Sequence, residues 1–195
     1  RIISTDHTDS DVIAMARSDK EACIQVFFIR GGKLTGREYF MVEGAEDIPE
    51  EEVLSEVIKQ FYDQAPNIPG NILLPRQVEE AKIIKQWLQG QRGGEKVELL
   101  LPHSPDQQNL IDMAAENACE MLKALQTQQE NELEKVEEAL DEIQEKLNLG
   151  APPRRIECYD ISNIQGATQV GSMVVFCDGR PQKNHYRRFN IRTVS

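Results

Sequence analysis

The amino-acid sequence predicts a mixed α/β fold in which two units are joined by a long acidic helix. Three observations predict it: apolar strands flank a double-glycine turn at residues 31–32, strands and helices then alternate as far as residue 125, and a second set of strands flanks an Asp-Gly turn at residues 178–179. Glycine turns between apolar runs are typical of antiparallel hairpins, and alternation of strands with helices indicates parallel strands joined by crossover helices.

Composition indicates a soluble, cytoplasmic globular protein. Of the 195 residues, 39% are hydrophobic, and no apolar run approaches the roughly 20 residues that span a bilayer. The four cysteines form no Cys-x-x-Cys pair, so we expect reduced thiols rather than a zinc site or a disulfide framework. The opening residues, Arg1-Ile2-Ile3, resemble the interior of a longer chain, and we expect further sequence before them.

The charge is unevenly distributed along the chain. Residues 1–125 carry 22 acidic and 13 basic residues, residues 126–150 carry 8 and 2, and residues 151–195 carry 3 and 7, which together give the net charge of −11. Only the last segment has a net positive charge, which binding to phosphate groups requires.

The first unit is expected to begin with an antiparallel meander. Strands are predicted over residues 12–16, 22–29 and 33–42, where β-branched and aromatic side chains are frequent. After Pro49 the apolar side chains recur at helical spacing, and glutamates occupy the first turn, where negative charge favours the helix dipole. A helix is therefore predicted from there to Ala65.

Parallel additions are expected to complete this unit. A strand is predicted over residues 71–74, a helix over 77–89 and a strand over 97–101. A further helix, capped by Ser104 or Asp106, carries an apolar stripe at every third or fourth position. Three antiparallel strands followed by helix, strand, helix, strand and helix is the order of an RNase H-like unit.

Residues 126–150 are predicted to form an acidic connecting helix. Apolar side chains step by three and four residues through a background of glutamate, glutamine and lysine: Leu133, Val136, Leu140, Ile143 and Leu147. Two heptads are too few for a secure coiled coil. We favour an extension of the preceding helix that lays this seam on a neighbouring domain, and the alternative is a docking helix for a partner protein.

The last segment, residues 151–195, repeats the opening pattern. Strands are predicted over residues 156–161, 168–176 and 182–191. Both meanders begin near an aspartate, Asp11 in the first and Asp160 in the second, which suggests an internal duplication.

Asp160 is the leading candidate for a functional side chain. It shares the two-residue period of Ile156 and Cys158, which places a charged group in the middle of an apolar strand. A buried carboxylate needs a compensating partner, which can be an arginine, a cluster of backbone N–H groups or a divalent cation. The residues alone leave these alternatives open.

Three separated blocks of the last segment resemble the start of the endonuclease domain of the UvrC family. They are PRRIECYDISNIQG at residues 153–166, VGSMVVFCDGRP at residues 170–181 and YRRFNI at residues 186–191. The resemblance extends more loosely upstream, through FIRGGKL at residues 28–34 and the acidic helix, and so covers essentially the whole chain.

The resemblance implies a role in nucleotide excision repair within the UvrABC complex. Proteins of this family incise damaged double-stranded DNA after UvrB has verified the lesion, and their RNase H-like domain makes the 5′ incision. Asp160 falls on the family's first catalytic aspartate, which would ligate Mg²⁺ or Mn²⁺. The remaining catalytic acids and a histidine are expected beyond Ser195, so we expect this chain alone to be inactive.

Basic residues near Asp160 are candidates for contact with the DNA backbone. These are Lys183, Arg187 and Arg188. Adjacent residues of a strand face opposite sides, so only one of the two arginines can share a face with Asp160, and Lys183, His185 and Arg187 are expected to line one side. A solvated edge strand protected by basic side chains is the alternative.

The first unit is expected to be catalytically silent. Three aspartates lie at its opening strand, Asp6, Asp9 and Asp11, but its later strands end at Leu74-Pro75 and Leu101-Pro102 without a carboxylate. We expect these aspartates to be solvated. The alternative function is therefore a protein-interaction or scaffold module that docks the nuclease to UvrB or to other UvrC domains. A nucleotide-binding enzyme is disfavoured because no glycine-rich phosphate loop follows a predicted strand.

Overall fold

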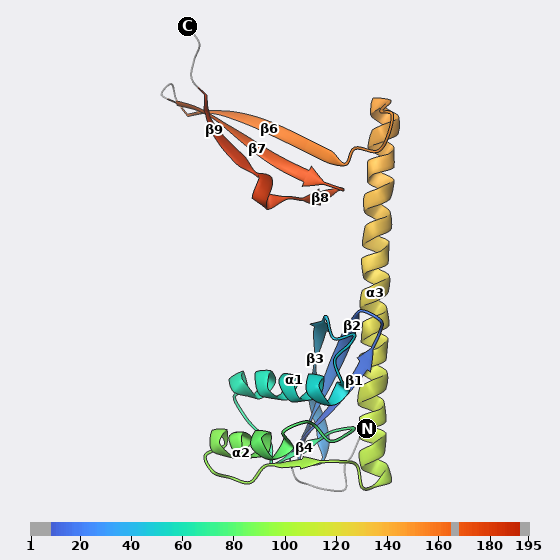
Figure 1. Ribbon diagram of the computed structural model, residues 1–195, viewed down its shortest axis with the longest axis vertical. Helices are drawn as coiled ribbons and strands as arrows, with labels where there is room; N and C mark the ends of the chain where they lie inside the picture. The colour runs from blue at the N-terminus through green and yellow to red at the C-terminus, as the bar shows by residue number, and fades with distance from the viewer. Residues whose placement is uncertain (1–8, 165–167, 192–195) are drawn as a thin grey trace. The chain divides into compact units, whose positions relative to one another are not determined.

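The computed structural model describes residues 9–164 and 168–191 and divides the chain into two compact units (Figure 1). The first unit is Arg1–Leu125 and the second is Gln126–Ser195.

A five-stranded sheet forms the centre of the first unit. Its strands are β1 (Ser10–Arg17), β2 (Glu21–Arg30), β3 (Lys33–Glu43), β4 (Asn71–Leu73) and β5 (Glu98–Leu100). The order across the sheet is β3-β2-β1-β4-β5. The first three strands pair antiparallel, and β4 and β5 add in parallel beyond β1. The predicted meander with parallel additions is confirmed, and this is the strand order of an RNase H-like unit.

Helices cover both faces of this sheet. They are α1 (Glu50–Gln64), α2 (Ala81–Gln91) and the start of α3 (Pro105–Leu147). Ile13 on β1 belongs to the core beneath α1 and α2, whereas its neighbour Val12 belongs to the core beneath α3. Successive side chains of a strand point to opposite faces, so an apolar run such as VIA in β1 requires cover on both sides.

Helix α2 begins later than the sequence pattern indicates. The predicted start was residue 77, but the helix begins at Ala81. Glu80, which precedes it, has a left-handed backbone with φ of 52°. Val78 is buried in the same core without being helical, so its apolar character reflects packing rather than helix periodicity.

The sheet of the second unit is built around β7. Its elements are β6 (Arg155–Ile164), β7 (Thr168–Cys177), β8 (Arg180–Pro181), the short 3-10 helix η1 (Lys183–His185) and β9 (Arg187–Ile191). Strand β7 pairs antiparallel with β6 on one side and with β8 and β9 on the other. The predicted turn at residues 178–179 is confirmed.

The predicted single strand over residues 182–191 is wrong. Strand β8 ends at Pro181, although the backbone N–H of Gln182 still donates to the carbonyl of Val175 at 2.8 Å, and pairing with β7 resumes at Arg187. The intervening residues form η1, where the backbone N–H of His185 donates to the carbonyl of Gln182 at 2.9 Å. Lys183 and His185 therefore do not belong to a strand face.

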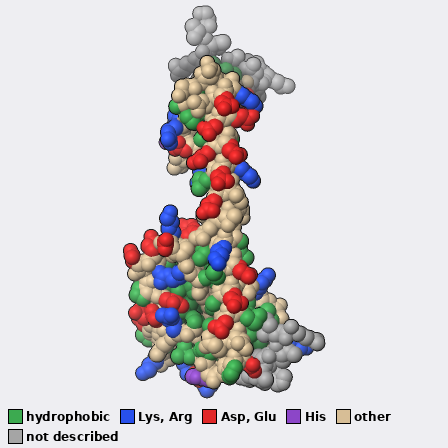
Figure 2. Space-filling model, turned by 90° about the vertical axis from the view of Figure 1, so that its right-hand side faces the viewer, with side chains coloured by type: hydrophobic (Ala, Val, Ile, Leu, Met, Phe, Trp, Pro, Cys, Tyr) green, Lys and Arg blue, Asp and Glu red, His purple; other side chains and the backbone are tan. Residues whose placement is uncertain are grey.

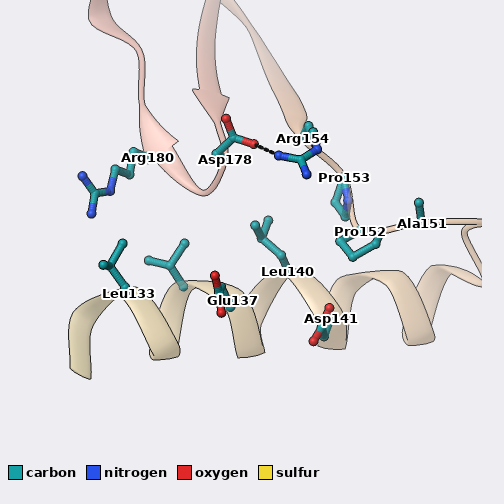
Figure 3. A pocket seen from close by; sticks show the side chains of 11 residues that line it. Leu133, Glu137, Leu140, Asp141, Ala151, Pro152, Pro153, Arg154, Asp178 and Arg180 are labelled. Carbon is teal, nitrogen blue, oxygen red and sulfur yellow. Dashed lines mark hydrogen bonds and ion pairs between the residues drawn. The ribbon is translucent and has the colours of Figure 1, made fainter. Parts of the chain in front are cut away.

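Helix α3 continues without interruption to Leu147, so the favoured prediction of a helix extension is confirmed. Its apolar seam meets the Asp178-Gly179 turn of the second unit (Figure 3). A Cβ atom added to Gly179 would overlap Val136 Cγ1 and would lie 3.6 Å from Leu140 Cδ1. The middle of the seam is thus covered within this unit, whereas Leu133 is 46% exposed and Leu147 is 65% exposed.

No helix of the described residues is long and apolar enough to cross a membrane. All four cysteines are free thiols.

We predict that Gly179→Ala destabilises the second unit by about 2 to 4 kcal/mol, because it combines a strained positive φ with overlap against a β-branched side chain. Gly31→Ala is the matched control, since Gly31 also has a positive φ but no atom within 4 Å of an added Cβ. Urea denaturation of the whole chain measures both. Val136→Ala should recover part of the loss in Gly179→Ala, and equal losses in the two glycine variants would contradict the contact.

Candidate functional site around Asp160

Asp160 lies in a row of side chains that crosses three strands. It is directly opposite Ser172 on β7, and Ser172 is directly opposite Arg188 on β9. Directly opposite residues of antiparallel strands project to the same face, with Cβ atoms about 4.5 to 5.5 Å apart. One face of this sheet therefore carries a carboxylate, a hydroxyl and a guanidinium in sequence.

The expected burial of Asp160 is wrong for the described residues. Asp160 and Ser172 are both exposed, while Met173 and Val175 on the opposite face of β7 are buried. Strand β6 pairs only with β7 within the described part of the sheet. Because Asp160 is exposed, its carboxylate stays in contact with water and needs no cation to offset a cost of burial.

The two adjacent arginines of β9 lie on opposite faces, as the strand period predicts. Arg188 is in the row of Asp160, whereas Arg187 is opposite Met173 and shares its face with Tyr159. The Arg187 Nη1 atom donates to the carbonyls of Asn184 and Tyr186 at 2.9 and 2.8 Å. The expectation that Lys183, His185 and Arg187 line one strand face is wrong, because η1 removes the first two from the strand.

A polar network on the face opposite Asp160 was missed in the sequence. The Arg155 guanidinium contacts a Glu157 carboxylate oxygen at 2.6 Å, and the Tyr159 hydroxyl donates to the other oxygen at 2.5 Å. The hydrogen bond from Tyr159 and then that from Arg155 lower the pKa of Glu157 below its ordinary value. The sequence does contain a signal for this network, because the three residues follow one another at intervals of two and therefore share one face of β6.

The described residues contain no group of three or more histidine, cysteine, aspartate or glutamate side chains able to hold a metal ion. Asp160 and Ser172 offer hard oxygen atoms of the kind that Mg²⁺ and Mn²⁺ prefer. Magnesium sites usually combine one or two carboxylates with water and phosphate oxygens. The row can thus contribute one carboxylate ligand to a metal site, but it does not form a complete metal site by itself.

Asp11 differs from the expectation that the aspartates of the first unit are solvated. Asp11 is 1% exposed. Arg30 Nη1 donates to its Oδ1 at 2.8 Å, and the buried Tyr62 hydroxyl donates to its Oδ2 at 2.7 Å. Burial raises the pKa of Asp11 above its ordinary value, while the hydrogen bonds from Tyr62 and Arg30 oppose that rise.

Asp9 agrees with the expectation and Asp6 is outside the described residues. Asp9 is exposed, and its Oδ1 accepts a hydrogen bond from the backbone N–H of Gly31 at 3.1 Å. Asp11 is opposite Phe28, three residues before the turn at 31–32, whereas Asp160 is opposite Ser172, six residues before the turn at 178–179. The two aspartates therefore do not occupy equivalent positions in their meanders.

The strand order of the first unit and the meander of the second define a protein built from RNase H-like α/β units. Two family profiles match the chain, "UvrC Ribonuclease H-like domain" over residues 9–125 and "UvrC RNAse H endonuclease domain" over residues 144–195. The chain belongs to the UvrC family.

Curated relatives named UvrABC system protein C match over nearly the whole chain. The protein of Acetivibrio thermocellus is 44% identical over 195 residues, which are 100% of this chain and 31% of the relative. That of Clostridioides difficile is 42% identical over 186 residues, and one from Dehalococcoides mccartyi is 45% identical over 186 residues, each covering 95% of this chain and 31% and 30% of the relative. The chain thus spans about a third of the length of these relatives.

We predict that Arg30→Met lowers the free energy of unfolding by about 3 kcal/mol near neutral pH, because it leaves the buried Asp11 carboxylate without its cation. The pKa of Asp11 is already above its unfolded value, so stability falls as pH rises through the folded pKa. Removing Arg30 raises that pKa further, so Asp11 takes up a proton more readily in the variant, and the loss should therefore be smaller at acidic pH than near neutral pH.

Urea denaturation at the two pH values measures the Arg30 effect. Arg76→Met is the matched control, because Arg76 pairs with Glu50 and Glu51 at the surface, where such pairs contribute about 1 kcal/mol or less. Adding Asp11→Asn to Arg30→Met should restore most of the lost stability. An equal loss at both pH values would show that the effect is one of packing rather than of charge.

Proposed function

We propose that the chain is part of a metal-dependent DNA endonuclease of nucleotide excision repair, in which the second unit contributes to the 5′ incision of damaged DNA. The observation that supports this most directly is the open row of Asp160, Ser172 and Arg188 in the segment similar to an RNase H endonuclease domain. Residues 151–195 also carry seven basic and three acidic residues, and this net positive charge favours binding to a phosphate backbone.

In this proposal Asp160 is a ligand of Mg²⁺ or Mn²⁺. Such a cation, when bound, activates water and stabilises the charge that develops on the phosphodiester. Ser172 lies next to Asp160 in the row and offers a hydroxyl that can hold a water or a phosphate oxygen. Arg188 at the far end of the row is placed to contact the DNA backbone, and Lys183 and Arg187 remain weaker candidates for the same contact.

We further propose that the parent protein works in the cytoplasm, with UvrB and the UvrABC complex on damaged double-stranded DNA. The names of the curated relatives, UvrABC system protein C, support this assignment. A single carboxylate in the described row supports the proposal that the chain alone does not cleave DNA.

A second candidate function belongs to the first unit, which we propose is a catalytically silent scaffold. The specific observation in its favour is the pairing of Asp11 with Arg30 and Tyr62. Both carboxylate oxygens already accept hydrogen bonds in a buried setting, and the guanidinium supplies the positive charge there. The excess of acidic residues in residues 1–150 is suited to protein partners rather than to DNA.

We predict that Asp160→Asn in a version of the parent that holds the complete nuclease domain lowers 5′ incision by about a hundredfold or more, because the amide is a far weaker ligand for a hard divalent cation. A Mn²⁺ titration of incision against wild type measures the effect, with circular dichroism and thermal unfolding as controls for folding. Asp178→Asn is the matched substitution, since Asp178 lies in a turn, paired with Arg154. Incision at the wild-type rate in a folded Asp160→Asn protein would exclude the proposed role.

We predict that Arg188→Gln weakens binding of the same protein to DNA by about fivefold to tenfold and reduces the slope of log K against log salt concentration by about 0.9, as expected for one lost phosphate contact. Arg187→Gln is the internal control, because this neighbour projects from the opposite face and is engaged by backbone carbonyls. Fluorescence anisotropy at several salt concentrations measures both. A larger effect in Arg187→Gln would place the DNA on the other face of the sheet.

A further inference from the structure

A groove runs between α1 and α2 on the outer surface of the first unit. The two helices lie side by side on the same face of the sheet (Figure 1). The groove has a volume of about 590 Å³, with Ile83, Ile84 and Trp87 on the α2 side and Glu56, Lys59 and Asp63 on the α1 side. This volume is in the range of sites that receive several side chains of a ligand.

The α2 wall of the groove is an apolar ridge that faces water. Ile83 is 60% exposed, whereas its neighbour Ile84 is 1% exposed and belongs to the core. Trp87, one turn further along, packs against that core and remains partly accessible. Residues four apart share a helix face, so Ile83 and Trp87 form one continuous surface. Tryptophan is among the residues that contribute most to binding at protein interfaces.

Two carboxylates, Glu56 and Asp63, lie on the α1 wall of the groove beside Lys59 and Gln60. Residues 43–63 contain eight acidic residues and one basic residue, Lys59. The Lys59 ammonium is already engaged, at 2.8 Å from Glu56 and 3.4 Å from Glu80. Glu52, Glu56 and Asp63 follow the helical repeat along the same side of α1. Glu56 and Asp63 outweigh Lys59, the one basic side chain among the residues that line the groove, so the charge beside the apolar ridge is net negative.

We propose that this groove binds a basic amphipathic helix of a partner protein. Apolar side chains at positions i, i+3 or i+4 and i+7 of that helix would cover Ile83 and Trp87, and flanking lysines or arginines would face Glu56 and Asp63. The same charge disfavours nucleic acid at this surface. This inference rests on the proposed scaffold function of the first unit and specifies the surface and the chemistry of its partner.

Trp87 provides a direct readout, because it is the single tryptophan of the chain. The probe is a synthetic peptide of about 14 residues, long enough for four helical turns, with leucines on one face and lysines on the others. We expect a saturable change in Trp87 emission with a dissociation constant of about 10 to 100 μM, the affinity of a small unoptimised interface. A scrambled peptide of the same composition should bind at least about tenfold more weakly.

Ile83→Glu tests the groove without disturbing the core, since the side chain is mostly exposed. It should weaken the peptide about tenfold or more, while Tyr39→Glu, which adds the same charge at an exposed residue of β3, should change the affinity less than about twofold. Equal binding of the scrambled peptide, or unchanged affinity in Ile83→Glu, would overturn the proposal. Equal binding of a single-stranded oligonucleotide at Trp87 would also overturn it.

A different experimental result would contradict the scaffold role of the first unit. Loss of DNA incision in the parent carrying Asp11→Asn, with an unchanged midpoint of thermal unfolding, would make the first unit catalytic and would remove the basis of both proposals. Unchanged peptide affinity in Ile83→Glu overturns the groove alone, because a scaffold can act through another surface.

Discussion

The alternation of side chains along β1 and β2 is the constraint on which the first unit depends. Both strands bury apolar side chains on each face, so helices must cover the sheet on two sides: α1 and α2 on one, α3 on the other. Each fully buried valine, leucine or isoleucine contributes about 1.5 to 3 kcal/mol. Asp11 interrupts this pattern on the α1 side, and it is accommodated there because Arg30 and Tyr62 supply the hydrogen bonds that water would otherwise provide.

The same two-residue period gives the sheet of the second unit two faces with different side chains. On β7, Met173 and Val175 are buried while Ser172 is exposed. The register then fixes which side chains of β6 and β9 accompany Ser172, and it selects Asp160 and Arg188 rather than their immediate neighbours. The face on which a charged residue of this sheet lies therefore depends on whether its position in the strand is odd or even. Two charged residues that are adjacent in the sequence lie on opposite faces, so closeness in the sequence does not show which of them lie near each other.

The elements of the first unit could be predicted because its strands and helices have clear periods and glycine turns. Two features of the sites could not be predicted from the sequence. The burial of Asp11 depends on Tyr62, fifty-one residues away, and no local pattern announces that contact. The break at η1 also lacks a local signal, because Lys183–His185 leave the sheet although the surrounding residues have the composition of a strand. Asp160 was identified correctly as a strand residue, but its exposure depends on which elements cover that face, and this is a tertiary property. Its proposed role as a metal ligand still awaits a test.

The contact between the Gly179 turn and the seam of α3 limits what the acidic helix can bind. Figure 2 shows acidic side chains along this exposed helix, and its middle apolar positions, Val136 and Leu140, are engaged by the turn of the same unit. The sheet that carries this turn is joined to the helix by residues 148–154, so the turn competes as an intramolecular ligand at an effective concentration on the order of millimolar. A protein that used these two positions would first have to displace the turn, so its apparent affinity would be reduced by that competition. The centre of the seam is thus partly covered by the protein's own turn, and Leu133 and Leu147 are its exposed apolar positions.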